Sequence, residues 1–416
     1  MNETIISYKI RIYPSKNQKR IIQRTFGACR WIYNDYLRTN IERYKSGKDF
    51  LSGYEYSKKL TKWKKDNPDY MWLNDSEISS KAIHEAFMDA DEAYKKFFKK
   101  LRGFPRFKSR KHNPINSYFF IGEHIKFKHN KVKLPILGNV KISENGYVPT
   151  DRHIIGGTLS FKNGKYYASF RIKYSDDDIC KPYDQYTSGL GIDVGIKTYL
   201  TCANKYEDIY TFEKFLDQPI LKKYEDKINK LQKILSNKME VNYNRLLNQY
   251  FDKHQDLPPE NIKNIMKGES YSNSCIRLQN KISKLKEKQH NYKKNIIDKY
   301  VMTLVRLKPK FITIEDLSVK NLLENNASKQ LHRYIQDSMF RYFFSKLKFK
   351  CHIYCIELRQ ASKFFASSKL CHVCHHKKKD LKLSDRVYIC DNCKNEFDRD
   401  ENSAINLVHL KKYIIL

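Results

Sequence analysis

Two Cys-x-x-Cys pairs near the end of the chain constrain its fold more than any other feature. Cys371 and Cys374 are followed, after an interval of fifteen residues, by Cys390 and Cys393. Each pair places two thiolates on one tight turn, and a connection of about 15 to 20 residues lets the two turns meet at one Zn²⁺ ion, with Zn–S bonds of ~2.3 Å. We therefore expect a structural zinc site. The alternative, four buried free cysteines, is disfavoured by this spacing, and the neighbouring histidines are expected to be exposed rather than ligating.

The charge balance indicates a polyanionic partner. The 416 residues include 80 Lys and Arg against 46 Asp and Glu, a formal net charge of +34, which favours nucleic acid. Hydrophobic residues make up 40% of the chain, so a folded protein of two or three domains is expected. The N-terminus does not resemble a signal peptide and no apolar stretch is long enough to span a membrane, which predicts a cytoplasmic, nucleoid-associated protein. The other six cysteines are expected to be reduced thiols: Cys29, Cys180, Cys202, Cys275, Cys351 and Cys355.

The N-terminal half combines strands with an inserted helical segment. Residues 6–14 alternate apolar and polar side chains, which predicts a strand, and a basic amphipathic helix follows from Ser15 to Tyr44. An apolar stripe predicts a second helix over 77–101. Short alternating runs over 117–174 predict strands that could close a small barrel with the first strand, and 175–185 is interpreted as a linker.

A strongly basic run follows the second predicted helix. Residues 95–111 contain nine Lys or Arg and no acid, and phenylalanines lie between them. Such a run can be simply a solvated surface, but arginines among aromatic residues also suit phosphate contact and base stacking, which is the hypothesis we favour. The predicted nucleic-acid contacts, including two from the first helix, are Arg102, Arg106, Lys108, Arg110, Lys16 and Arg30.

The C-terminal half carries isolated acids on apolar strands. Asp193 lies in the hydrophobic run 188–203, and Glu315 ends the run 310–317. A buried strand does not ordinarily hold a carboxylate, so each is a candidate metal ligand. The other predicted elements of this half are amphipathic helices over 221–235 and 278–307, a long polar loop over 236–274, a helix over 330–348 and a strand over 351–358.

A third acid follows the second cysteine pair. Asp398 and Asp400 precede small and apolar residues, so one of them is expected to cap a helix. Three carboxylates from distant positions can together hold Mg²⁺ or Mn²⁺, which prefer oxygen ligands, and the net charge makes a phosphodiester the natural substrate. No Ser, Cys or His lies in a recognisable nucleophile motif.

The chain resembles the TnpB family of transposon-encoded nucleases, which are related to the type V CRISPR effectors. The motifs that carry this resemblance occur in the family's order: residues 8–18 (YKIRIYPSKNQ), 25–34 (TFGACRWIYN), 103–110 (GFPRFKSR), 191–198 (GIDVGIKT), 313–317 (TIEDL), 367–374 (SSKLCHVC), 390–393 (CDNC) and 398–407 (DRDENSAINL). Ala366 and His375 stand where family members carry proline and glycine.

The resemblance implies an α+β multidomain fold. Its parts would be a wedge β-barrel (1–14 and 102–180), an inserted helical recognition domain (15–101), a RuvC-like nuclease domain (186–365 and 395–416) and a zinc-ribbon target-strand loading module (366–394). It also implies a guide RNA, a double-stranded DNA target cleaved beside a short motif, and no membrane partner, with a monomer favoured.

The family's functional residues map onto this chain position by position. The catalytic acids become Asp193, Glu315 and Asp400, with Asp398 as second choice for the third, and the zinc ligands become the four paired cysteines. A nuclease-inactive RNA-guided regulator, a transposase that acts directly on DNA ends and a CRISPR effector with the same chemistry remain alternatives.

Overall fold

The computed structural model describes residues 3–110, 114–195, 198–254, 256, 272–316, 338–381 and 385–416. It divides into two compact units, Met1–Asp178 and Ile179–Leu416, which we describe separately. Within the described ranges, no helix is both long and apolar enough to cross a membrane.

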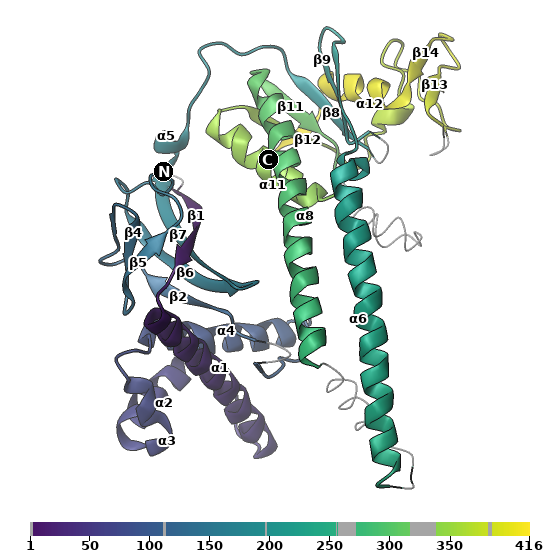
Figure 1. The fold of residues 1–416 in the computed structure, drawn as a ribbon. Helices are drawn as coiled ribbons and strands as arrows, with labels where there is room; N and C mark the ends of the chain where they lie inside the picture. The colour runs from purple at the N-terminus through teal and green to yellow at the C-terminus, as the bar shows by residue number, and fades with distance from the viewer. Residues whose placement is uncertain are drawn as a thin grey trace. The chain divides into compact units, whose positions relative to one another are not determined.

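The first unit contains a seven-stranded antiparallel sheet in the order β2-β6-β7-β1-β5-β4-β3 (Figure 1). All the runs predicted as strands in this part of the chain are strands. Their bounds are β1 (Glu3–Tyr13), β2 (Ser117–Ile121), β3 (Lys126–Lys128), β4 (Lys131–Leu134), β5 (Gly138–Ile142), β6 (Ile154–Lys162) and β7 (Lys165–Ser175). Ile10 and Ile12 of β1 are almost fully buried, as the alternation predicts.

The expected closed barrel is not present in the described residues. The sheet is open, and its edge strands β2 and β3 each have a single partner strand, β6 and β4. Closure needs edge strands of matched length and register, but β3 has only three residues. The expectation therefore holds for the strands themselves and not for the barrel.

Four α-helices lie between β1 and β2 in the chain. Ser15 caps α1 (Lys16–Lys45) through a reciprocal capping box with Gln18. α1 packs against α4 (Ser80–Phe98), and the buried Tyr36 hydroxyl of α1 donates to Asp91 Oδ1 of α4 at 2.6 Å. The other elements of this segment are α2 (Gly53–Asp66), α3 (Pro68–Met71) and the 3-10 turn η1 (Trp72–Asn74).

The second unit is built on a six-stranded mixed sheet in the order β10-β9-β8-β11-β12-β15. Its three central strands, β8, β11 and β12, are parallel, and the others are antiparallel to their neighbours. The short helix α5 (Asp176–Ile179) lies at the boundary between the two units. The strand bounds are β8 (Leu190–Val194), β9 (Leu200–Asn204), β10 (Ile209–Phe212), β11 (Phe311–Ile314), β12 (Glu357–Ala361) and β15 (Tyr413–Ile415).

Helices pack on this sheet and close its core. Ile192 and Ile312 of the sheet share one buried cluster with Val301 and Phe343 of the helices. The helices of the unit are α6 (Pro219–Phe251), α8 (Asn273–Arg306), α11 (Phe340–Ile353) and α12 (Arg399–Val408), with the 3-10 turns η2 (Phe215–Asp217) and η3 (Ser367–Lys369). A two-stranded hairpin of β13 (Val387–Ile389) and β14 (Glu396–Asp398) precedes α12.

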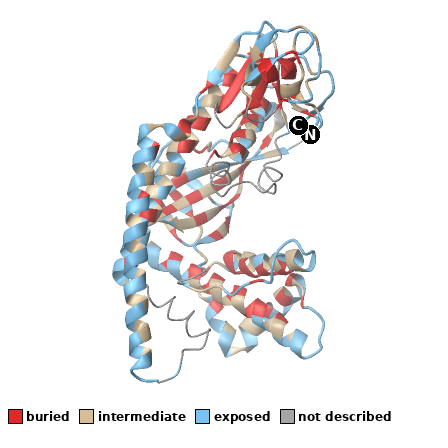
Figure 2. Ribbon diagram, turned by 90° about the vertical axis from the view of Figure 1, so that its right-hand side faces the viewer, coloured by how far each residue is buried: buried red, intermediate tan, exposed pale blue. Residues whose placement is uncertain are grey.

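Two predicted boundaries in the second unit are wrong. Residues 236–251, expected in a loop, extend α6, which runs beside α8 (Figure 1) and is largely exposed (Figure 2). Residues 351–353, expected to begin a strand, end α11 instead, and β12 begins only at Glu357. Residues 255, 257–271 and 317–337 lie outside the described residues. These ranges include most of the rest of the predicted loop over 236–274 and the start of the predicted helix over 330–348.

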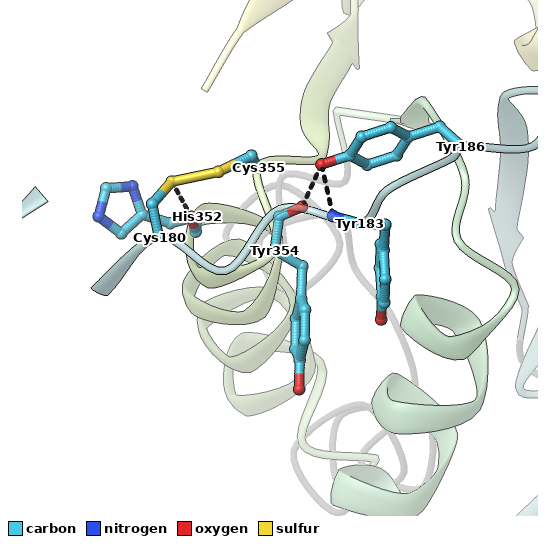
Figure 3. The surroundings of a disulfide bond; sticks show 6 residues. All are labelled: Cys180, Tyr183, Tyr186, His352, Tyr354 and Cys355. Carbon is cyan, nitrogen blue, oxygen red and sulfur yellow. Dashed lines mark hydrogen bonds between the residues drawn. A yellow bond between two sulfur atoms is a disulfide. The ribbon is translucent and has the colours of Figure 1, made fainter. Parts of the chain in front are cut away.

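A disulfide joins Cys180 to Cys355, with 6.2 Å between their Cα atoms. We expected both as reduced thiols, and this prediction is wrong, because the fold brings together two cysteines that are 175 residues apart in sequence. Figure 3 shows the bond beside three tyrosines. Tyr183 and Tyr354 stack at 5.1 Å, and the Tyr186 hydroxyl donates to the Tyr354 carbonyl at 2.9 Å. The other four cysteines expected as thiols are free and buried.

Candidate functional site

Asp193 lies on the central strand β8, all five residues of which are buried. Helix α12 approaches the backbone of this strand closely at Gly191. A Cβ atom at that position would lie 2.1 Å from the Ala404 carbonyl oxygen, which no real side chain tolerates. Gly191 therefore permits the contact that brings α12 against Asp193.

Glu315 follows β11, the parallel neighbour of β8. Because Ile314 pairs with Ile192 in parallel strands, Asp193 and Glu315 lie next to each other at the same end of these strands. Ser403 of α12 lies between them: its hydroxyl donates to Asp193 Oδ1 at 2.9 Å, and its Oγ lies 3.3 Å from Glu315 Oε1. The Ser367 hydroxyl also donates to Glu315. The structure thus brings together two acids that the sequence places more than a hundred residues apart.

The third predicted acid, Asp400, lies in the first turn of α12. Asp398 is the N-cap of this helix, since its side chain accepts hydrogen bonds from the backbone N–H groups of Asp400 and Glu401 at 2.8 and 3.1 Å. Asp400 Oδ2 pairs with Arg386 at 3.5 Å and lies near Gly195, just beyond the end of β8. The capping role therefore falls to Asp398 and leaves the Asp400 carboxylate beside Asp193.

The electrostatics of this cluster suit a cation. Burial, and then the negative charges of Glu315 and Asp400, raise the pKa of Asp193 well above its ordinary value. A divalent cation would relieve this repulsion, and carboxylate oxygens are the ligands that Mg²⁺ and Mn²⁺ prefer, so the residues fit such an ion. In the described ranges, one group of three or more His, Cys, Asp or Glu residues has all its ligand atoms within 4.8 Å of one another, and this group is the four paired cysteines. The three acids are more widely spaced than that.

The four paired cysteines form a second candidate metal centre. Sγ of Cys371 lies 3.7 Å from Sγ of Cys393, and Sγ of Cys374 lies 3.4 Å from Sγ of Cys390. Tetrahedral zinc with Zn–S bonds of ~2.3 Å requires sulfur atoms about 3.8 Å apart, so the set fits a structural zinc ion. The buried Leu381 and Tyr388 pack around the thiols.

Buried asparagines of α12 fasten the cysteine module to the acid cluster. Asn402 Oδ1 accepts from the backbone N–H of His372 at 3.0 Å, and its Nδ2 donates to the Leu370 carbonyl at 2.8 Å. Asn406 Nδ2 donates to the carbonyls of Ser367 and Leu370 at 2.9 and 2.6 Å. The sequence prediction missed these residues, because their partners lie 30 to 39 residues earlier in the chain and come close only in the folded protein.

The predicted nucleic-acid contacts lie in the first unit, and two of them are neighbours. Burial, and then the positive charge of Arg110, lower the pKa of Arg30. Asn34 of α1 holds the basic run by two hydrogen bonds to the backbone of Lys108, at 2.7 and 2.8 Å. Lys16, Arg102 and Arg106 are exposed, and Lys111 lies outside the described residues.

Part of the basic face of α1 is neutralised within the unit. Arg20 pairs with Glu77 at 2.5 Å, and Arg24 pairs with Asp75 at 2.6 Å. These arginines hold the segment before α4 against α1. Lys16 and Arg30, the two predicted contacts on α1, are not among these paired arginines.

Two stretches of the chain match known families. Residues 1–49 match HTH_OrfB_IS605, described as a helix-turn-helix domain, and residues 340–407 match the Cas12f1-like TNB domain. In the structure the first stretch contains β1 and α1, and the second runs from α11 through the cysteine module to α12.

Relatives cover almost the whole chain. It is 26% identical over 413 residues to a Streptomyces pristinaespiralis protein provisionally named RNA-guided DNA endonuclease, covering 98% of this chain and 90% of that one. It is 24% identical over 421 residues to InsQ of Escherichia coli strain K12, which carries the same provisional name, covering 97% and 91%. A chain in the cryo-EM structure of a Cas12f1–sgRNA–target DNA complex matches over the full length of both chains, with 14% identity and a TM-score of 0.54.

The chain therefore has a mixed α/β fold similar to that of Cas12f1. The chain resembles the TnpB family, and the two domain matches together with the full-length relatives confirm the resemblance indicated by the sequence motifs.

Proposed function

We propose that this protein is an RNA-guided DNA endonuclease of a transposable element, which cleaves double-stranded DNA beside a short flanking motif by metal-dependent hydrolysis. The observation that carries the proposal is the placement of Asp193, Glu315 and Asp400 at one edge of the second unit's sheet. The names of the two full-length relatives support guidance by RNA.

The finer architecture is part of the proposal. Residues 1–14 and 102–180 would form the wedge domain, here with an open sheet, and 15–101 the recognition domain. Residues 186–365 and 395–416 would form a RuvC-like nuclease domain, and 366–394 the zinc-ribbon module. The parallel strands β8 and β11 with α12 against them, and the thiol geometry, support the last two assignments.

The chain's own residues would arrange the reaction as follows. Asp193, Glu315 and Asp400 would hold Mg²⁺ or Mn²⁺, which when bound supplies an activated water and neutralises charge on the phosphodiester. Ser403 and Ser367 fix the carboxylate of Glu315, and Ser403 also fixes Asp193. Arg386, beside Asp400, is placed to approach a substrate phosphate. Zinc bound by the four paired cysteines would hold together the segment 366–394, which precedes α12 in the chain.

Recognition of nucleic acid would be divided between the guide and the protein. Base pairing between guide RNA and target supplies the sequence specificity, while cationic side chains contact the backbones. We assign this role to Lys16, Arg30, Arg102, Arg106, Lys108 and Arg110. The proximity of Arg30 and Arg110 supports it, since two guanidinium groups without an acid between them favour an anion.

The test is to express the full chain with the DNA that follows its gene, sequence the RNA that copurifies, and assay plasmid cleavage in Mg²⁺. Asp193→Ala is the inactive control. Guide-dependent double-strand breaks that disappear in this variant support the proposal. Bound RNA without cleavage, across a library of flanking motifs, would instead indicate a guided regulator. Strand-transfer products would indicate a transposase.

A further inference from the structure

A contiguous group of aromatic rings surrounds the end of α4, and we call it the ring cluster: Phe50, Tyr94, Phe97, Phe98 and Phe104. Tyr94 is its buried centre, with ring centroids 5.2 Å from Phe50, 6.0 Å from Phe98 and 5.6 Å from Phe104. The cluster therefore joins α4 to segments on both sides of it in sequence.

Three of these rings are open to solvent although they pack together. Phe98 is 58% exposed, Phe104 51% and Phe50 38%. Single exposed aromatic side chains are ordinary, but a contiguous exposed group marks an interaction surface.

The charge around the ring cluster indicates the kind of partner. Earlier on α4 the cations are neutralised along the helix: Lys95 pairs with Asp91 at 2.7 Å, and Lys96 pairs with Glu92 at 3.3 Å. Beyond this point, residues 93–122 contain no acid at all. The exposed cations that follow, none of which pairs with an acid in the described part of the chain, include Lys99, Lys100, Arg102 and Arg106.

The surface is held in place before any partner binds. Lys100 adopts a left-handed conformation with φ of 55°, and its N–H donates to the Phe97 carbonyl at 2.8 Å. Leu101 N–H donates to the Lys96 carbonyl at 2.9 Å, so the chain turns directly after α4. Asn34 holds the far end of the segment at Lys108. A surface ordered in this way loses little conformational entropy on binding.

We propose that the ring cluster is a stacking platform for unpaired bases of the guide RNA, with Lys99, Lys100, Arg102 and Arg106 contacting its phosphates. Aromatic side chains among cations are the combination that binds single-stranded nucleic acid, because every base offers a flat face and every linkage a charge. Paired bases hide their faces in the helix, so the platform selects unpaired segments. The proposal rests on the proposed function for the identity of the RNA, and the stacking itself does not depend on cleavage.

The test compares binding of the full-length protein to a labelled single-stranded RNA 20-mer and to an abasic oligomer of equal length and charge. Phe98→Leu combined with Phe104→Leu keeps apolar volume but removes the flat faces, and we expect it to weaken binding of the base-bearing RNA roughly tenfold. Binding of the abasic oligomer is expected to stay unchanged. Tyr54→Leu, which removes a ring that is 69% exposed on α2 and outside the cluster, is the matched control.

Two results would overturn the platform. One is equal loss of binding to both oligomers. The other is a wild-type protein that binds both oligomers equally well.

A second variant, Phe98→Trp, reports stacking directly: its fluorescence is expected to be quenched by the single-stranded RNA. A blue-shifted emission that RNA leaves unchanged would mean that protein covers the ring. If the wild-type protein shows stacking but does not cleave the plasmid, the proposed function is rejected and the stacking platform is not.

Discussion

The hydroxyl of Ser403 donates a hydrogen bond of 2.9 Å to the carboxylate of Asp193, a residue 210 positions earlier in the chain. The same oxygen lies 3.3 Å from Glu315. One buried side chain of α12 thus contacts two acids, one on β8 and the other directly after the neighbouring parallel strand β11. This contact makes α12 part of the candidate nuclease site even apart from Asp400.

Replacing Ser403 with alanine is expected to lower guide-dependent cleavage roughly 10- to 100-fold at limiting Mg²⁺, which is the usual cost of losing a group that orients metal ligands. Without the hydroxyl, Asp193 and Glu315 lose their common partner and repel each other freely. Titrating Mg²⁺ in the plasmid assay checks this, and part of the loss should be recovered at high metal concentration. Ser362→Ala, at an exposed serine of the same unit, is the control and should cut normally.

The two acids at the start of α12 are expected to separate into structural and chemical roles. Asp398→Ala removes the N-cap, so the free energy of unfolding should fall by about 1 kcal/mol while most of the cleavage remains. Asp400→Asn preserves shape but removes a candidate ligand, and should abolish cleavage with little change in stability. Chemical denaturation and the cleavage assay measure both effects. The reverse pattern would assign the third catalytic position to Asp398.

The sequence predicts the parts of this site whose signals are local. The cysteine pairs reveal themselves by spacing, and Asp193 by being a charge within an apolar strand. Ser367, Ser403 and Asn402 could not be predicted in the same way, because their roles arise only when α12 packs against β8 and the first cysteine turn.

The errors in the fold have similar physical causes. The end of α6 was predicted as a loop because a helix exposed on most sides shows only a weak apolar stripe, and only Leu221 and Ile228 of α6 are buried. The apolar run at the end of α11 was assigned to a strand because short apolar runs do not distinguish strand from helix. The pairing of Cys180 with Cys355 has no local signal at all.

Asp193→Asn is expected to make the metal-free protein more stable while abolishing cleavage. Burial and two neighbouring acids raise the pKa of Asp193, so the charged form destabilises the fold. This destabilisation is absent below the ordinary pKa of aspartate and develops as the pH rises towards the raised pKa. At neutral pH in EDTA the variant should gain about 1 to 3 kcal/mol in unfolding free energy. Thermal melting should also show that Mg²⁺ stabilises the wild type and not the variant.

Asn402→Ala is expected to disconnect the cysteine module from the acid cluster without removing zinc. The substitution leaves the His372 N–H without its partner and removes one of the two hydrogen bonds to the Leu370 carbonyl, although the four Sγ atoms keep their positions. Zinc content per chain should therefore match the wild type, while cleavage falls at least tenfold and amide exchange in α12 speeds up. Asn395→Ala, at an exposed asparagine beside the second cysteine pair, should alter neither cleavage nor exchange. Loss of zinc from the Asn402 variant would contradict this account, because it would make the asparagine a support of the metal centre itself.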